Sequence, residues 1–282
     1  MRYKNKFGIN LFNNVLKRDS KLLDEKNSLE AVWYDAEAQD YLGQLKCSPG
    51  LMPMDRDFEK WFAAFVDSPR QYLAFDKDSV FFNAFPDFKC LRVLELGSGN
   101  GCLSRFFLRR DAEVISIDLS RNYGKFLKQS HNRSSPLVSC AERLPFKDKG
   151  FDIITSFVSL HHFNLDLCLA EIYRVLKDDG RGIFIEPLSD SRFLYQLRQI
   201  IPVADNESPG GGGLQSVELK NKLTQAGFDY SIKKFELFSR LERLPFCSRF
   251  QNHLRRLDYF LLRFFPFLGR FARNIVIEIK KR

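Results

Sequence analysis

Short apolar runs alternate with stretches of helical character along the middle of the chain. The runs that we predict to be buried strands cover residues 91–96, 113–118, 151–157, 181–186 and 274–279. We expect helices between them, the clearest over 102–109 and 169–180, with a further one before Ala226. Strands that alternate with helices in this way are typical of an α/β fold.

The first predicted strand ends at a glycine-rich turn. Residues 95–101 read Glu-Leu-Gly-Ser-Gly-Asn-Gly, and the glycines permit positive φ and a close approach of the backbone to a ligand. The helix behind the turn offers free N–H groups at its start. A dinucleotide fingerprint needs G-x-G-x-x-G, whereas here the third glycine comes two residues after the second. The turn therefore indicates a nucleoside-bearing cofactor and disfavours a nicotinamide-dependent oxidoreductase.

Further landmarks follow this turn in a fixed order. They are a second strand that ends in Asp118, the loop and strand over 140–157, the segment Glu171-Ile-Tyr-Arg-Val-Leu-Lys-Asp-Asp-Gly180, and Ala226-Gly-Phe228. Together they resemble the class I S-adenosylmethionine-dependent methyltransferases, within them the type 11 methyltransferase-domain family. The resemblance covers about residues 90–240 and the last strand. It implies a Rossmann-like, mostly parallel seven-stranded sheet with an antiparallel last strand, and S-adenosyl-L-methionine as cofactor.

The resemblance also implies where the cofactor lies. Gly97, Ser98 and Gly99 would follow its methionine and ribose portions. Asp118 would accept both ribose hydroxyls, which needs two acceptor oxygens side by side. Leu119 would lie against the adenine face.

The adenine end departs from the family pattern. Cys140 stands where many relatives carry an aspartate, and a thiol is a poor acceptor for an amino group. We expect the backbone of Cys140 and Ala141, or the Glu142 side chain, to supply that contact. Phe157, at the end of the fourth strand, and Tyr41, in a W-x-D-x-x-A-x-x-Y stretch, complete the predicted cofactor site. An aromatic cluster that anchors the N-terminal region is an equal alternative for Tyr41.

Two residues are candidates for catalysis. Methyl transfer needs alignment and exclusion of water, with a base only where the acceptor must lose a proton. His161 follows the fourth strand and could act as that base, and Glu186 ends the fifth strand, where substrates usually bind. The alternatives are that the paired histidines 161 and 162 cap or pack, and that Glu186 forms an internal salt bridge. The six cysteines form no C-x-x-C pair and no cluster with the histidines, so we expect no metal site.

The 282 residues are enough for one sizeable α/β domain with a cap. We predict an N-terminal helical cap over 1–88 and a methyltransferase domain over 89–282. Residues 188–216, with four consecutive glycines, form a lid or a slack connection. The polar residues near the N-terminus interrupt any signal-like apolar run, and we expect a cytoplasmic protein, free or on the membrane periphery.

The basic charge gathers at the end of the chain. Residues 240–282 hold eleven of the lysines and arginines against three acids, while the whole chain has a net charge of +9. Arg249, Arg256, Arg263 and Arg270 recur every seven residues, and an apolar face runs through Leu254, Leu257, Leu261, Phe264, Leu268 and Phe271. We expect Pro266 to break the helix. The segment 240–273 is either a basic amphipathic surface for an anionic membrane or an ordinary helical insertion packed on the core.

The sequence thus predicts a methyltransferase that acts on an O, N or C atom of a small-molecule or lipid-like acceptor, such as a lipid, quinone or glycan precursor. The alternative is a methyltransferase-like scaffold that serves as a partner subunit. A nucleic-acid substrate is disfavoured, because no RNA-binding signature or aromatic platform accompanies the charge.

Overall fold

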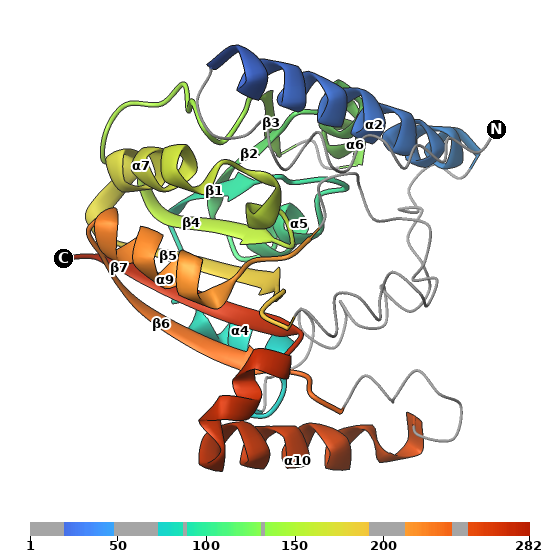
Figure 1. Ribbon diagram of the computed structural model, residues 1–282. Helices are drawn as coiled ribbons and strands as arrows, with labels where there is room; N and C mark the ends of the chain where they lie inside the picture. The colour runs from blue at the N-terminus through green and yellow to red at the C-terminus, as the bar shows by residue number, and fades with distance from the viewer. Residues whose placement is uncertain (1–19, 48–72, 87–88, 131–132, 192–211, 239–247) are drawn as a thin grey trace.

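The computed structural model describes residues 20–47, 73–86, 89–130, 133–191, 212–238 and 248–282. Its centre is one seven-stranded sheet in the order β3-β2-β1-β4-β5-β7-β6 (Figure 1). The strands are β1 Arg92–Leu96, β2 Glu113–Asp118, β3 Ser135–Val138, β4 Phe151–Phe157, β5 Leu176–Pro187, β6 Phe228–Phe235 and β7 Asn274–Lys281. The first five pair in parallel, and β7 runs antiparallel to both β5 and β6. This is the Rossmann-like methyltransferase sheet that the family resemblance implied.

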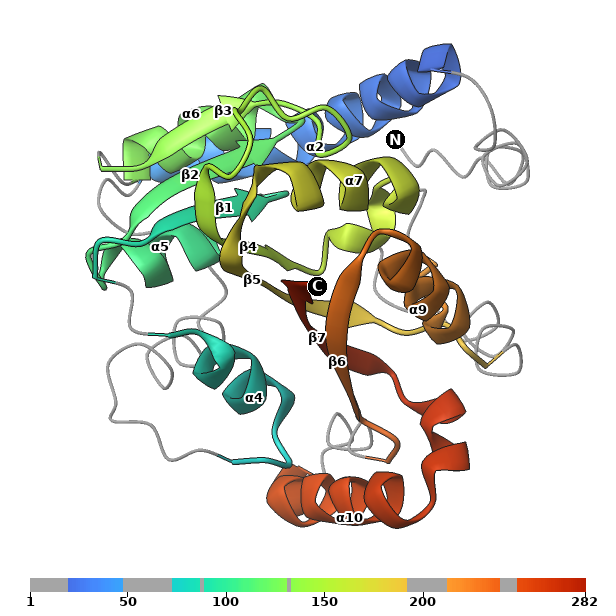
Figure 2. The same ribbon diagram turned by 90° about the vertical axis from the view of Figure 1, so that its left-hand side faces the viewer.

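Helices cover both faces of the sheet. The α-helices are α2 Ser20–Cys47, α4 Lys77–Ala84, α5 Cys102–Leu108, α6 Arg121–Ser130, α7 Leu165–Val175, α9 Ser216–Gln225 and α10 Gln251–Phe264. The 3-10 turns are η1 Leu160–His162, η3 Ser248–Phe250 and η4 Pro266–Phe271. In two perpendicular views, α2 lies at one end of the molecule beside α6, and α10 lies at the opposite end (Figures 1 and 2). No helix in the described ranges is long and apolar enough to cross a membrane.

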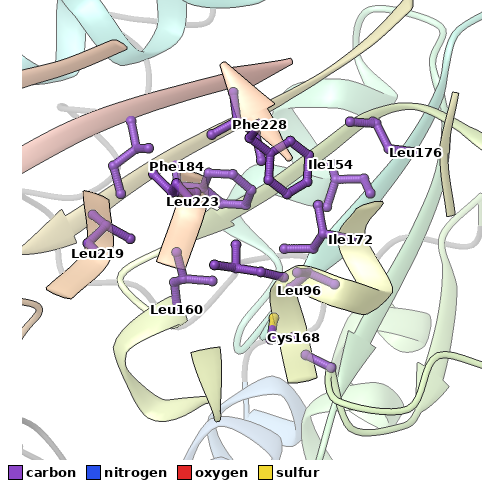
Figure 3. Close-up of a cluster of buried hydrophobic side chains, with 14 of the residues drawn as sticks. Leu96, Ile154, Leu160, Cys168, Ile172, Leu176, Phe184, Leu219, Leu223 and Phe228 are labelled. Atoms are coloured by element: carbon purple, nitrogen blue, oxygen red, sulfur yellow. The ribbon is translucent and has the colours of Figure 1, made fainter. Parts of the chain in front are cut away.

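Alternate strand residues build two hydrophobic cores, as the pleat of a strand requires. Leu94, Ile154 and Phe184 pack with α7 and α9 on one face. Figure 3 shows Ile154 and Phe184 among the side chains of this core. Val93 and Ile153, each adjacent in sequence to a residue of the first core, pack with α4 and α5 on the other face. The second core is rich in phenylalanine, with ring centroids of Phe82 and Phe106 only 4.7 Å apart. Both faces of the sheet are therefore covered by apolar side chains, and the ends of the strands remain as the place where a ligand can bind.

The helix predicted over 169–180 is shorter than expected. It ends at Val175, and β5 begins at Leu176, which pairs with Phe151. A register shift follows between Phe151 and Ile153. Gly180 lies in this irregular part, where a Cβ would come within 2.8 Å of the Leu176 side chain and 3.0 Å of a carbonyl oxygen. Pairing with β4 therefore overrides the local preference for helix.

The basic segment near the end of the chain forms α10 and η4, and Pro266 starts η4 after α10 has ended, as predicted. Four of the six residues of the predicted apolar face are half-buried, and two are exposed. Leu254 and Leu261 turn inward and are half-buried, whereas Leu257 is 46% exposed and Phe264 is 58% exposed. The orientation of α10 is set by a polar contact. The residue that α10 buries is Asp258, and its carboxylate accepts from the backbone N–H groups of residues 237 and 238 at 2.9 Å each.

Candidate functional site

A pocket of about 180 Å³ opens where β1, β2 and β4 end and where the chain leaves β3. Parallel strands present their carboxyl ends at one edge of the sheet, so ligands of such folds bind there. The pocket wall comes from these four exits and from α2, which crosses above them (Figure 1). The site thus joins segments that are more than one hundred residues apart in the sequence.

The glycine turn after β1 forms one wall. Gly97, Gly99 and Gly101 have φ of +64°, +48° and +81°, in the left-handed region that favours glycine. A Cβ on Gly97 would meet Ser159 at 2.6 Å, and one on Gly101 would meet Leu127 at 2.3 Å. A Cβ on Gly99 would meet no atom within 4 Å, and Gly99 lines the pocket. Two glycines therefore allow packing, and the third leaves room beside the backbone for a ligand.

Asp118 ends β2 and holds this turn. Its Oδ2 accepts from the N–H of Gly99 at 2.8 Å, and its Oδ1 accepts from the N–H of Ser120 at 2.9 Å. Burial raises the pKa of the Asp118 carboxyl to about 6, although the two backbone donors work against that shift. A carboxylate has about four lone-pair positions, so each oxygen keeps capacity for a further donor. The side chain lines the pocket, and its spare acceptor capacity would suit two hydroxyl groups.

The loop after β3 forms the next wall through Cys140, Ala141 and Glu142. Burial, with the nearby Glu142 carboxylate, raises the pKa of the Cys140 thiol, so the thiol stays neutral. Glu142 accepts from the N–H of Asn164 at 2.8 Å through Oε1. Its Oε2 is buried and has no hydrogen-bond partner among the described residues. Such an orphaned oxygen is costly, and a ligand amino group would satisfy it.

The helix α2 closes the pocket with Glu30 and Tyr34, which sequence reasoning missed. It is held there by Asp35, which accepts from the N–H of Asn122 at 3.0 Å, and by Glu37, which accepts from the Tyr123 hydroxyl at 2.7 Å. The spacing of 30, 34 and 37 places these residues on one face of a helix. That spacing was the available signal, but nothing local says which surface the face will meet.

His162, rather than His161, lies at the pocket wall. Its Nε2 is 3.4 Å from the Tyr34 hydroxyl, and its Nδ1 is 3.7 Å from Oε1 of Glu30. Its carbonyl oxygen accepts from the Lys26 ammonium group. Burial lowers the pKa of His162, while Glu30 opposes the shift. The imidazole is therefore neutral at physiological pH and able to accept a proton.

The two residues predicted for catalysis lie behind the wall and do not line the pocket. Glu186 is fully buried, and its Oε1 accepts from Ser156 Oγ and from the N–H groups of Ser159 and Leu160 at 2.8 to 3.0 Å. Its Oε2 lies 2.7 Å from Nδ1 of His161. The carboxylate thus caps η1 and pairs internally, as in the alternative interpretation, and neither side chain lines the described pocket.

Most of the residues predicted to contact the cofactor line this pocket, namely Gly97, Gly99, Asp118, Leu119, Cys140, Ala141, Glu142 and Phe157. Ser98 is buried in the turn, where its N–H donates to the Ile117 carbonyl at 3.0 Å. Tyr41 lies within α2, but its side chain is outside the described ones. Most of the predicted lid, residues 192–211, is also outside the described residues. Cofactor contact by each of these residues stays a prediction.

These features fit a cofactor that carries a nucleoside. The space beside Gly99, the spare acceptor capacity of Asp118 and the orphaned oxygen of Glu142 lie in one pocket. A ribose offers two neighbouring hydroxyl donors, and an adenine offers an amino group. The apolar wall contributed by Leu119, Ala141 and Phe163 suits the flat face of the base.

Comparison with known proteins agrees with this geometry. A family model described as a methyltransferase domain matches residues 94–184. Arginine-hydroxylase NDUFAF5 of Homo sapiens is 34% identical over 124 residues, which cover 42% of this chain and 34% of that protein. Demethylmenaquinone methyltransferase of Streptomyces avermitilis is 31% identical over 121 residues, which cover 40% of this chain and 52% of that protein. The chain thus spans about a third to a half of the length of these curated relatives.

Solved structures share the fold. An S-adenosylmethionine-dependent methyltransferase from Mesorhizobium loti has a TM-score of 0.50 at 15% identity, over 72% of this chain and 96% of that one. A chain solved in a complex with the Trm112 methyltransferase activator of Haloferax volcanii has a TM-score of 0.55 at 15% identity, over 88% of this chain and 98% of that one. The chain therefore carries a methyltransferase domain over residues 94–184 and has the fold of the class I S-adenosylmethionine-dependent methyltransferases, with S-adenosyl-L-methionine as cofactor.

Proposed function

We propose that the protein transfers a methyl group from S-adenosylmethionine to an O, N or C atom of a small-molecule or lipid-like acceptor. One observation carries the proposal. The same pocket holds a carboxylate with spare acceptor capacity, Asp118, and a neutral imidazole, His162. The first suits the cofactor, and the second suits an acceptor that must lose a proton.

When bound, the cofactor would supply a methyl group on a positively charged sulfonium sulfur. In-line attack of a nucleophile on the methyl carbon would release that sulfur as a neutral thioether. The chain's own groups align and shield this reaction. Asp118 would orient the ribose, and Glu142 would hold the base. Phe157, Phe163 and Tyr34 line the pocket with rings and would keep water from the reacting atoms.

His162 is the group that we propose as general base. The proton of an acceptor hydroxyl would pass to the imidazole as the acceptor oxygen forms its new bond to carbon. The Glu30 carboxylate, 3.7 Å from Nδ1, would stabilise the imidazolium that results. Glu30 Oε1 has no hydrogen-bond partner among the described residues and lies 3.9 Å from the Lys26 ammonium group, so it can still accept a hydrogen bond from the imidazolium.

A quinone-type, lipid or glycan-precursor acceptor remains our proposal for the substrate class. It is supported by the apolar and aromatic side chains in the pocket lining, such as Leu119, Phe157 and Phe163, and by the similarity to a relative whose name states that it methylates demethylmenaquinone. The runner-up is a cofactor-binding scaffold that serves as a partner subunit. It is favoured by the similarity to a human protein whose name states hydroxylation rather than methylation.

Calorimetry and a transfer screen test the proposal. We expect S-adenosylmethionine, or its demethylated product, to bind, and NAD not to bind. With tritium-labelled methyl groups, we expect label to enter one fraction of lipid, quinone, glycan or small-molecule extracts. Cofactor binding without transfer to any fraction would support the scaffold instead. Binding of NAD without S-adenosylmethionine would overturn the cofactor assignment.

A substitution of His162 tests its role as general base separately from any effect on folding. We expect His162→Asn to keep cofactor binding and to lose most transfer, about 10²–10⁴-fold as for other general bases. The wild-type rate should fall on acidification only below about pH 6.5, since burial lowers the pKa of His162. His253→Asn, at an exposed position on α10, is the matched control. Equal rates and equal pH profiles for wild type and His162→Asn would remove His162 from the mechanism.

A further inference from the structure

The outward side of α10 and η4 carries large apolar side chains that no other part of the described structure covers. Phe260 and Phe264 are 52% and 58% exposed, and Phe267 in η4 is 68% exposed. The rings of Phe260 and Phe264 lie 4.5 Å apart, one turn from each other. Arg256 and Arg263 are exposed on the same helix. We call these five residues the Phe/Arg surface.

The orientation of α10 follows from contacts on its opposite side. Asp258 is buried beneath the helix, where it accepts from two backbone N–H groups. Arg255 pairs with the buried Asp76, the residue that caps α4. These polar contacts hold the inner face against the domain. They leave the phenylalanines in solvent, an arrangement that costs free energy unless another surface covers them.

The arginines share that outward side. A seven-residue spacing is close to two helical turns of 3.6 residues, so Arg256 and Arg263 lie one above the other. Arg263 bonds the Tyr259 hydroxyl at 3.3 Å, and Arg256 lies over the Phe75 ring at 5.2 Å. Within the described ranges, neither guanidinium group forms an ion pair with a carboxylate. Their N–H groups therefore remain suited to phosphate oxygens.

We propose that the Phe/Arg surface binds an anionic lipid bilayer. A bilayer offers an apolar boundary for the phenylalanine rings and phosphate groups for the arginines at the same level. A second copy of the chain fits less well, because residues 240–282 hold eleven bases against three acids and two such faces would repel each other.

The surface is separate from the pocket. No residue of α10 lines the pocket, and α10 lies at the end of the molecule opposite α2 in both views (Figures 1 and 2). Binding to a membrane would therefore leave the pocket accessible. The proposal is independent of the transferred group, and its failure would not bear on methyl transfer.

Sedimentation with vesicles tests the proposal on the full chain. We expect the protein to sediment with vesicles of equal parts phosphatidylglycerol and phosphatidylcholine, and not with phosphatidylcholine alone. Sedimentation should weaken as NaCl is raised, since salt screens such charges. Each arginine near the surface contributes about fivefold to affinity, so Arg256→Gln with Arg263→Gln should lower it by about 30-fold.

Two further variants make the test specific. Phe260→Ser with Phe264→Ser should abolish sedimentation, although it keeps every charge. Lys220→Gln with Lys280→Gln removes two exposed charges from α9 and β7 and should sediment like the wild type. Circular dichroism melts confirm that each variant folds.

Three results would overturn the proposal. The wild type could stay in the supernatant with anionic vesicles at low salt, or the paired arginine variant could sediment unchanged. Alternatively, light scattering could show a dimer that Phe260→Ser with Phe264→Ser disrupts, and neither the wild type nor any variant would bind vesicles. The surface would then be an interface between two copies.

Discussion

Replacement of Glu95 by glutamine should make the chain more stable in mildly alkaline solution and should remove one source of its pH dependence. Glu95 lies in β1 and is only 2% exposed. One carboxylate oxygen accepts from the Ser116 hydroxyl at 3.0 Å and from the Ser104 hydroxyl. A glutamine has nearly the same shape, and serine hydroxyls can rotate to accept as well as donate. The substitution therefore removes the charge and keeps the packing.

The magnitude follows from the pKa of Glu95. Burial raises it from 4.5 to about 7, and the two serine hydroxyls oppose the shift. Between these two values the folded chain binds more protons than the unfolded chain, so the free energy of unfolding falls as pH rises. At 1.36 kcal/mol per pH unit, the loss is about 3 kcal/mol at most. It is complete above about pH 8, where the buried carboxyl is charged.

The assay is urea unfolding of the wild type and of Glu95→Gln, followed by circular dichroism from about pH 5 to pH 9. Subtraction of the two free energies removes the contributions of other groups, such as Asp118, whose pKa burial raises to about 6. We expect the variant to gain on the wild type by up to about 3 kcal/mol across this range. A difference that stays constant within about 0.5 kcal/mol, or that changes with the opposite sign, would refute the reasoning.

Other predictions concern the cofactor site. Asp118→Ala should weaken S-adenosylmethionine binding by about 1.5–3 kcal/mol, as for hydrogen bonds to a charged group, and an unchanged dissociation constant in calorimetry would exclude Asp118 from the site. Since ribose hydroxyls favour the charged form of Asp118, whose pKa is about 6 in the free protein, affinity should be constant above about pH 6 and should fall below it. That fall should be absent in Asp118→Asn. Gly99→Ala should cost only the ~1–2 kcal/mol of a left-handed residue in urea unfolding but should weaken cofactor binding markedly, because its Cβ would occupy open pocket space. Gly101→Ala should lower the stability more than Gly99→Ala and weaken cofactor binding less, because its Cβ would meet Leu127 at 2.3 Å. Equal effects of the two substitutions on stability and on binding would contradict the assignment of the pocket.

Contiguous features were predictable from the sequence. The strands β2 and β4 have the predicted bounds, because a buried parallel strand is a short run of apolar residues whatever surrounds it. The glycine turn and Asp118 were also recognisable, because the ligand approaches a backbone whose conformation depends on the residues of the turn itself. The pocket lining contributed by this turn and by the loop after β3 was therefore predictable through the resemblance of these local segments to the methyltransferase family.

Choices between neighbouring residues were not predictable. His161 and His162 are adjacent, and which imidazole faces the pocket depends on the Glu186 carboxylate, which caps η1 and pairs with His161. That carboxylate comes from another strand, 25 residues further along the chain. The end of α7 shows the same limit, because pairing with β4 draws Leu176 into a strand.

The sequence by itself determined the fold class, the glycine turn with its carboxylate, and the presence of a basic amphipathic segment, since each depends on the order of nearby residues. Only the tertiary structure decided that Glu30 and Tyr34 of α2 close the pocket, and that Phe260 and Phe264 of α10 face outward. Both outcomes depend on contacts between distant segments, such as Asp35 with α6 and Asp258 with the end of β6. A helical pattern shows which residues share a face, but the partner that buries a face is chosen by the whole fold.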